Sequence, residues 1–354
     1  MKNCFKTLYL DIHMIQMLPP SNVNRGQMGE PKTALIGGST RARISSPSQK
    51  RPARMEMSHN FEIAKRTKHT AGEIKERLVA SGIEASRADE LSQLALKESQ
   101  IASSKADAKD TLVYLSDAQI DSMSKVMIDY EQNPASEDEK VKNLKKSLKE
   151  AINNNPTVDQ LLCGRMFASD PSMNYDAATQ VMNGFSVNEV KYEFDYFSAV
   201  DDLAEKYTPE KSGASHVSSR IFTDPVLYRY ANVNLSETSE LVKYDKQHAA
   251  ENAIAFAKAF ITTLPTGASN TYASGTIPSH VLLILREDRP VNFAPAFIET
   301  VKSENFITEA IEKLEAERLR VDKFLGEPLY AESDKDSSMK EMLAHIKDEI
   351  ARRL

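Results

Sequence analysis

Cysteine is scarce in this sequence, tryptophan is absent and no long apolar run occurs. The 354 residues include only Cys4 and Cys163, which favours a reducing compartment and two inert thiols. No run of about 18 apolar residues exists, so we expect no transmembrane helix. The apolar N-terminal stretch is interrupted by Asp11 and His13 and lacks a small-residue cleavage site, which argues against a signal peptide. These absences predict a cytoplasmic protein without a membrane partner.

The motifs of metal and nucleophilic sites are also missing. The seven histidines are scattered singly, and neither HExxH nor CxxC occurs. No Walker phosphate loop and no G-x-S-x-G occur, and Gly37-Gly38-Ser39 is too short to cradle a phosphate. We interpret those glycines as a hairpin turn or a close approach of the backbone to a ligand. Asp201 and Asp202 could bind a divalent ion but are better explained as a surface helix end. The sequence therefore predicts no metal, no cofactor and no enzymatic activity.

Positive charge is present, but it is concentrated in one segment. The net charge of the chain is −6, whereas residues 22–68 contain ten basic and three acidic residues, a net of +7 that leaves −13 for the rest. Such asymmetry is typical of proteins that bind nucleic acid, although the overall acidity points the other way. A solvated surface with chance clustering is the alternative.

The residue types in this segment suit a sugar–phosphate backbone. Arginine and lysine neutralise phosphates and release counterions, while Ser45, Ser46 and Ser48 can hydrogen-bond phosphate or sugar oxygens. A helix that begins near Pro47 would also present free backbone N–H groups to an anion. None of these groups reads a base edge, so the predicted contact is independent of sequence. Pairing of the arginines with nearby acids would account for one or two of them only.

Hydrophobic periodicity predicts the first half of the chain. Residues 6–18 alternate and predict a half-buried strand, which ends at Pro19-Pro20. Residues 21–46 are expected to form a long loop, followed by a helix from Ser46. Pro52 either kinks that helix or delays its regular part. Residues 70–162 read as nearly continuous helix, with a lysine-rich face. We interpret those lysines as solvated.

The second half mixes strands and helices. We expect a short helix in MNYDAATQVMNGF, a strand in VLYRYANVNL, a helix in AENAIAFAKAFITTL, two strands in HVLLILRED and PVNFAPAFIETV, and two closing helices. The order of elements predicts an α+β fold that is compatible with a ferredoxin-like core carrying large insertions.

The basic segment also carries a family signature. SNVNRGQMGEPKTALIGGSTRARISSPSQKRPAR closely resembles the N-terminus of the repeated backbone subunit of the type I-E CRISPR surveillance complex, Cascade (the CasC family). The shared pattern is an Asn-Arg start, a Lys, a Gly-Gly, an Arg-x-Arg, a Ser-Ser pair and a Lys-Arg. GRMFASDP, DYFSAVDDL, GASH, LYRYANVNL and PTGASNTYAS recur in the same order, so the likeness runs from about residue 6 to residue 300.

This resemblance implies a fold and a function. The fold would be an RRM-like (ferredoxin-like) palm, residues 1–59 and 221–354 with a web loop near 265–278, with helical fingers at 60–162 and a thumb at 163–220. The protein would be a non-catalytic RNA-binding subunit that polymerises along CRISPR guide RNA in antiviral defence. Segments between displaced bases would pair with target DNA. Its partners would be CRISPR RNA, target DNA through the guide, further copies of itself and other Cascade subunits.

The resemblance also assigns roles to residues. Met166 and Phe197 would be apolar thumb wedges that displace a base. Contacts to the guide backbone would come from Arg25, Lys32, Arg41, Arg43, Ser45, Ser48, Lys50 and Arg51, and from Asn270 and Ser274 in the web. In the fingers, Lys142, Lys145 and Lys146 would face target DNA.

Two other classes of function stay open. An RNA-processing endonuclease on a related fold would need a catalytic histidine near the basic segment, for which His59 is the only candidate. A self-assembling protein without nucleic acid is the second.

Overall fold

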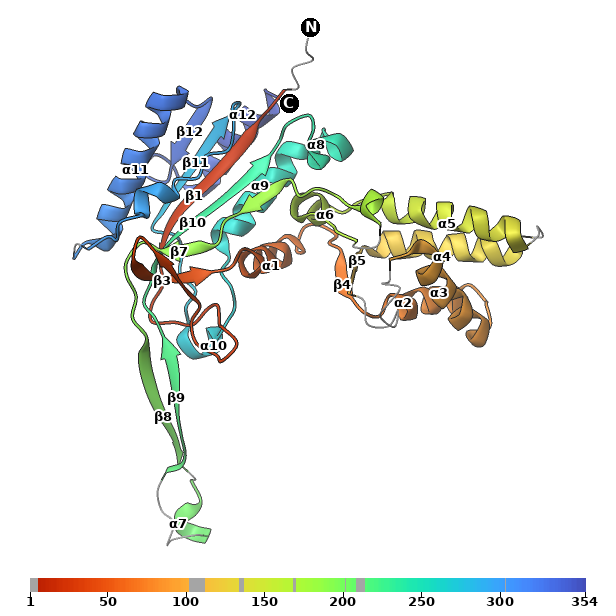
Figure 1. The fold of residues 1–354 in the computed structure, drawn as a ribbon, viewed down its shortest axis with the longest axis horizontal. Helices are drawn as coiled ribbons and strands as arrows, with labels where there is room; N and C mark the ends of the chain where they lie inside the picture. The colour runs from red at the N-terminus through yellow and green to blue at the C-terminus, as the bar shows by residue number, and fades with distance from the viewer. Residues whose placement is uncertain are drawn as a thin grey trace. The chain divides into compact units, whose positions relative to one another are not determined.

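The computed structural model describes residues 6–101, 112–133, 137–167, 170–200, 202–207, 214–302 and 304–354 (Figure 1). The chain forms two compact units. The first, which we call the sheet unit, comprises Met1–Glu56, Gln180–Val233 and Ala253–Leu354. The second, the helical unit, comprises Met57–Thr179 and Asn234–Asn252.

The sheet unit is built on a mixed set of short and long strands in the order β12-β11-β1-β10-β7-β3-β2, with β6 paired to β10 outside this path. β1 and β11 are antiparallel, from Tyr9 opposite Arg286 to Ile15 opposite His280. The strands are β1 (Tyr9–Met17), β2 (Thr33–Ile36), β3 (Ser39–Ile44), β6 (Thr179–Val181), β7 (Gly184–Ser186), β10 (Val226–Asn234), β11 (His280–Arg286) and β12 (Tyr330–Ser333).

The central strands are buried on both faces. Leu10, Ile12 and Met14 on one face of β1 and His13 and Ile15 on the other are all fully buried. The prediction of a half-buried strand is therefore wrong, because β1 lies inside the sheet and both of its faces are covered. The face that contains Ile15 packs against α11 (Phe306–Leu325), and α12 (Met339–Ala351) follows β12. Both closing helices were predicted correctly.

The expected strand at residues 290–301 is not formed. That segment contains a short 3₁₀ helix, η4 (Ala294–Phe297), and β11 pairs instead with β1 and β12. The side chain of Asn292 accepts the N–H of Ala294 at 2.9 Å, which closes a turn. Pro290 and Pro295 have no N–H to give to a strand ladder.

The expected loop at residues 21–46 contains a hairpin. β2 and β3 are antiparallel, with Ile36 opposite Ser39. Gly37 and Gly38 have φ of +57° and +80°, the left-handed values that a tight hairpin turn requires. The interpretation of these glycines as a turn is confirmed, and the long loop is corrected. Helix α1 (Ser46–Met57) then runs through Pro52, so regular helix does not wait until Pro52.

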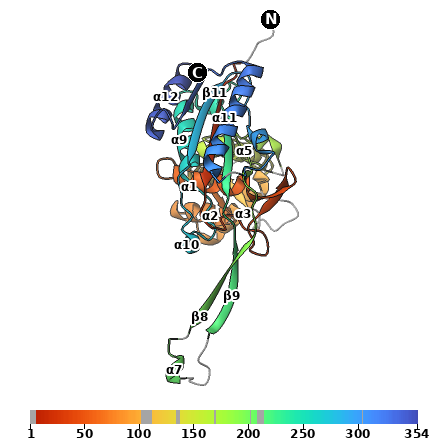
Figure 2. The same ribbon diagram turned by 90° about the vertical axis from the view of Figure 1, so that its left-hand side faces the viewer.

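A second hairpin extends from the sheet unit beyond the sheet itself (Figures 1 and 2). It consists of β8 (Glu193–Val200) and β9 (Ala214–Phe222), with Glu193 opposite Phe222 at its base. Seven of the eight β8 residues are exposed, and Phe197 is half-buried. α7 (Ala204–Tyr207) lies between the two strands in sequence.

The helical unit packs around its own apolar core, which includes Ile74, Leu91, Met123 and Leu148. Its elements are β4 (Lys65–Thr67), α2 (Thr70–Ala80), α3 (Ala85–Ser99), β5 (Val113–Leu115), α4 (Asp117–Gln132), α5 (Glu137–Asn153), α6 (Val158–Cys163), η2 (Pro171–Met173) and α8 (Glu240–Asp245). The prediction of a mainly helical block is confirmed for these residues.

The prediction of a short helix in MNYDAATQVMNGF is wrong. The backbone of Tyr175 pairs with Arg165, and the N–H of Ala178 donates to Leu161 at 2.9 Å. These partners come from other segments rather than from the preceding helical turn. The segment therefore becomes extended, and β6 and β7 follow.

A buried histidine joins β11 to its surroundings. His280 is 1% exposed, with Nδ1 2.6 Å from Asp334 Oδ1 and Nε2 3.6 Å from Glu315 Oε1 on α11. Burial alone would lower the pKa of His280, but the two carboxylates raise it overall. The ring of His280 thus lies between a carboxylate that follows β12 and one on α11. Among the described helices, none is long and apolar enough to cross a membrane.

Candidate nucleic-acid interface

The basic segment folds back onto β3. The N–H of Lys32 donates to Asn24 at 2.9 Å, and the N–H of Arg43 donates to Lys32 at 2.8 Å. Arg25 forms an isolated bridge with Pro31 at the start of this fold-back. Backbone pairing therefore brings together Arg25, Lys32 and Arg43, which the sequence separates.

Four of the predicted cations remain at least partly exposed. Arg25 and Arg51 are exposed, and Lys32 and Arg43 are half-buried. None of the four forms an ion pair within the described residues. The first turn of α1 contains no acid, and Arg54 lies in its last turn. We call these four residues the basic rail, and cations without a carboxylate partner suit an anionic ligand.

The N-terminus of α1 does not offer the free N–H groups that were predicted. The N–H of Ser45 donates to Asn24 Oδ1 at 2.9 Å, and that of Ser46 donates to Asn183 Oδ1 at 2.8 Å. Pro47 has no N–H, and that of Ser48 donates to the carbonyl of Ser45. Two asparagines from elsewhere in the chain thus occupy the donors that an anion would use. The Ser45 and Ser48 hydroxyls also pair with each other at 3.1 Å.

Arg41 is not part of the rail, and its predicted contact with RNA is wrong. Its side chain is fully buried. Its guanidinium donates to the carbonyls of Ser186 and Val187, each at 2.7 Å, and to those of Phe297 and Ile298 at 3.2 and 3.4 Å. Strand alternation turns Arg41 and Arg43 to the same face, but the 297–298 segment covers Arg41 alone. Arg41 therefore links the 186–187 and 297–298 segments inside the sheet unit.

The predicted web loop lies against the basic segment. A Cβ on Gly267 would be 2.4 Å from the carbonyl oxygen of Val23, so only glycine permits this approach. Asn270, in α10 (Ser269–Tyr272), is exposed beside it. Ser274 is only 3% exposed, which contradicts its prediction as an RNA contact.

Arg220 is a residue that the sequence analysis missed. It lies at the base of the β8–β9 hairpin and donates to Thr271 of α10 at 3.1 Å. Its guanidinium also lies 4.6 Å from the centre of the Phe197 ring. The alternation in VSSRIF could have indicated an exposed arginine, but only the pairing of β8 with β9 places it over Phe197.

The predicted wedge residues lie in different units. Phe197 belongs to the hairpin of the sheet unit, whereas Met166 belongs to the helical unit and is 81% exposed. Met166 lines a cavity of about 430 Å³ with Arg66, Tyr114 and Arg165. Lys145 and Lys146 on α5 are exposed, and the side chain of Lys142 lies outside the described residues.

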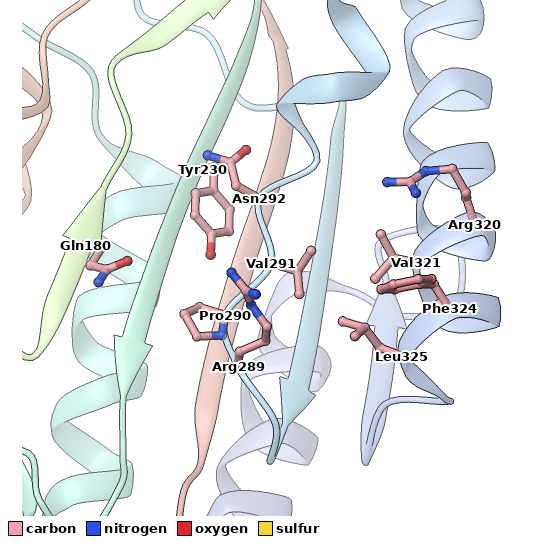
Figure 3. A pocket seen from close by; sticks show the side chains of 10 residues that line it. All are labelled: Gln180, Tyr230, Arg289, Pro290, Val291, Asn292, Arg320, Val321, Phe324 and Leu325. Atoms are coloured by element: carbon pink, nitrogen blue, oxygen red, sulfur yellow. The ribbon is translucent and has the colours of Figure 1, made fainter.

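A second cavity, of about 460 Å³, lies in the sheet unit, and none of its lining residues is a predicted site residue (Figure 3). Its lining includes Arg289, which follows β11, and Arg320 on α11. Arg320 is held by Glu317 through two contacts of 2.7 Å.

The described residues contain no group of three or more histidines, cysteines or carboxylates that could hold a metal ion. His59, the candidate for endonuclease chemistry, is exposed just beyond α1. Of the two adjacent aspartates, Asp201 lies outside the described residues and Asp202 is exposed.

The chain is similar to known proteins both in its three-dimensional structure and in its sequence pattern. One solved chain, from an assembly described as a CRISPR RNA-guided surveillance complex, pre-nicking, is 29% identical with a TM-score of 0.80 and covers 98% of this chain and 100% of its own length. A chain from another CRISPR RNA-guided surveillance complex is 25% identical with a TM-score of 0.61 and the same coverage. No curated protein matches the sequence.

These structures confirm the predicted resemblance to subunits of CRISPR surveillance complexes, and they share the α+β architecture. The sequence pattern of the CT1975-like proteins matches residues 10–351, nearly the whole chain. The chain therefore belongs to the CT1975-like protein family.

Proposed function

We propose that this protein is a non-catalytic, RNA-binding backbone subunit of a type I-E CRISPR surveillance complex. In this proposal several copies polymerise along the CRISPR guide RNA and present its spacer to target DNA. Other subunits of the complex are further partners. The observation that carries the proposal is the basic rail, four cations without a carboxylate partner among the described residues, in a chain similar to subunits of such complexes.

The rail suits the phosphate backbone of a single strand. Arginine and lysine side chains neutralise phosphates whatever the base, and no described group on this surface is arranged to read a base edge. Lys50, Ser45, Ser48 and Asn270 extend the same surface in this proposal. A subunit that must accept any guide needs this kind of contact, because base pairing carries the sequence information.

Each of the two units would then have its own role in the complex. The sheet unit would be the RRM-like palm, with its web loop near 265–278 and its protruding hairpin as the main part of the thumb. The helical unit would supply the fingers, whose Lys142, Lys145 and Lys146 would face target DNA. Phe197, held under Arg220, and Met166 would displace one base at each subunit boundary. Unstacking a base costs a few kcal/mol, which the phosphate contacts of the rail would offset.

The test uses purified full-length protein and fluorescently labelled RNA single strands of different sequence, with polyuridine among them. We expect binding that does not depend on sequence, a raised ratio of absorbance at 260 to 280 nm in the copurified complex, and no cleavage of the strand. Replacement of Arg25, Arg43 and Arg51 by alanine should weaken binding to all sequences alike. The matched control is Arg352→Ala with Arg353→Ala, because both of these arginines are already paired with Glu349.

Equal binding by the triple variant and the wild-type protein would remove the rail from the site. Cleavage of the strand that disappears on replacing His59 would favour the endonuclease alternative. Assembly without any bound RNA would favour a self-assembling protein.

A further inference from the structure

Arg229 is a fully buried arginine in the middle of the sheet unit. It lies on β10, between β1 and β7 (Figure 1). Its neighbours Tyr228 and Tyr230 point to the opposite face of the sheet, into the core against α11. Within the described residues no carboxylate pairs with it, and burial lowers the pKa of Arg229 to about 9. A buried cation without a counter-ion is expensive to keep, so its contacts indicate what it is for.

Those contacts reach three separate elements. Nε donates to Gln49 Oε1 on α1 at 3.1 Å, and Nη1 donates to Gln16 Oε1 on β1 at 2.7 Å. Nη2 donates to the carbonyls of Phe260 and Thr263 at 2.9 and 3.0 Å, at the end of α9 (Ala249–Thr262). The guanidinium also lies 4.6 Å from the centre of the Phe260 ring. Each of its nitrogens is thus used.

Gln49 and Gln16 extend this hydrogen-bond network to helix α1 and to the 263–276 loop. We call these two segments the walls of the proposed RNA site. Gln49 directly precedes Lys50 and Arg51 on α1, and its Nε2 donates to Met182 at 2.8 Å. Gln16 Nε2 donates to the carbonyl of Thr276 at 2.7 Å. Thr263 therefore anchors the start of the loop that carries Asn270, and Thr276 anchors its end. We propose that Arg229 is a positioning residue that holds helix α1 and the 263–276 loop in register with each other for the RNA backbone.

The fork geometry of arginine is what this role requires. A planar guanidinium can donate in three directions at once, whereas a lysine ammonium at the same depth keeps the charge but cannot reach the same four acceptors. The expected change in RNA affinity rests on the proposed function. The expected change in hydrogen exchange of residues 46–57 and 263–276 does not depend on it.

The experiment compares Arg229→Met and Arg229→Lys with the wild-type chain. Hydrogen exchange should become about tenfold faster in residues 46–57 and 263–276, while β1 and β11 stay protected. Affinity for labelled polyuridine should fall about tenfold in both variants. Arg41→Met is the matched control, because it also removes a fully buried arginine but one whose acceptors lie at 186–187 and 297–298.

Gentler variants keep the test decisive if Arg229→Met does not fold. Gln49→Leu should loosen residues 46–57 alone, and Gln16→Leu should loosen residues 263–276 alone. Rescue of both readouts by Arg229→Lys would mean that the charge, not the fork, matters, and would overturn the proposal. Faster exchange throughout the sheet unit would show that Arg229 stabilises the core in general, and this result would also overturn the proposal. If the triple variant of Arg25, Arg43 and Arg51 leaves polyuridine binding unchanged, the proposed function fails, whereas the exchange results still decide the role of Arg229.

Discussion

Arg41 and Arg51 belong to one basic segment but have opposite environments, and replacing each separates internal support from phosphate contact. Arg41 is fully buried against four backbone carbonyls, whereas Arg51 is exposed on α1. We expect Arg41→Met to change the stability of the protein and Arg51→Ala to change its interaction with RNA.

The magnitude for Arg41 follows from its hydrogen bonds. The two bonds of 2.7 Å, to Ser186 and Val187, are lost, and charge-assisted bonds contribute about 1.5–3 kcal/mol each. Removing a buried cation recovers part of its desolvation cost. The carbonyl of Val187 keeps the N–H of Val301 as a second donor at 3.0 Å. We therefore expect the free energy of unfolding to fall by about 3 kcal/mol, measured by urea unfolding with an unchanged m-value.

The magnitude for Arg51 follows from counterion release. Loss of one single-strand phosphate contact lowers the slope of log K against log salt by about 0.7, so the affinity advantage of the wild-type protein should shrink about threefold between about 50 and 200 mM salt. Stability should change by less than about 0.5 kcal/mol. Fluorescence anisotropy with labelled polyuridine measures both variants under conditions where each is folded.

Two results would refute this reasoning. A folded Arg41→Met protein whose salt slope falls as far as that of Arg51→Ala would mean that Arg41 reaches a phosphate. A stability loss below about 1 kcal/mol would mean that the hydrogen bonds from Arg41 to the Ser186 and Val187 carbonyls do not stabilise the protein as calculated.

Three further predictions concern the web, a histidine and the wedge. Gly267→Ala should destabilise the protein by about 1–3 kcal/mol in urea unfolding, since its methyl would lie 2.4 Å from the Val23 carbonyl oxygen; unchanged stability would contradict this contact. The raised pKa of His280 makes its stabilisation complete below the pKa of the unfolded chain and lost as pH rises through the folded value. The difference in unfolding free energy between wild type and His280→Gln should therefore shrink with rising pH, and a constant difference would contradict it. Met166→Ala with Phe197→Ala should leave RNA-bound assembly intact but flatten the periodic reactivity of guide bases in chemical probing, whereas persistent periodicity would place the wedge elsewhere.

The chemistry of the candidate site could be proposed from the sequence because that chemistry depends on composition and local order. The concentration of arginine and lysine between Asn22 and Lys68 indicated an anionic partner without any knowledge of the fold. The glycine pair predicted a turn, because only glycine adopts two successive left-handed conformations at no steric cost. Amphipathic periodicity likewise predicted the helical block and both closing helices, since these patterns extend over many residues.

Burial and pairing were decided only by the tertiary structure. Arg41 and Arg43 are equivalent in the pattern, yet the 297–298 segment, more than 250 residues away in sequence, accepts hydrogen bonds from one of them and leaves the other on the rail. Asn24 and Asn183 close the end of α1 to an anion, and no local signal shows that their side chains reach it. In the sequence, Arg229 is one polar residue in an alternating strand. Because β10 lies at the centre of the sheet, the side chain of Arg229 contacts α1, β1 and α9 together. Sequence patterns report neighbours along the chain, whereas the role of a buried polar group depends on which distant acceptors the fold brings within about 3 Å.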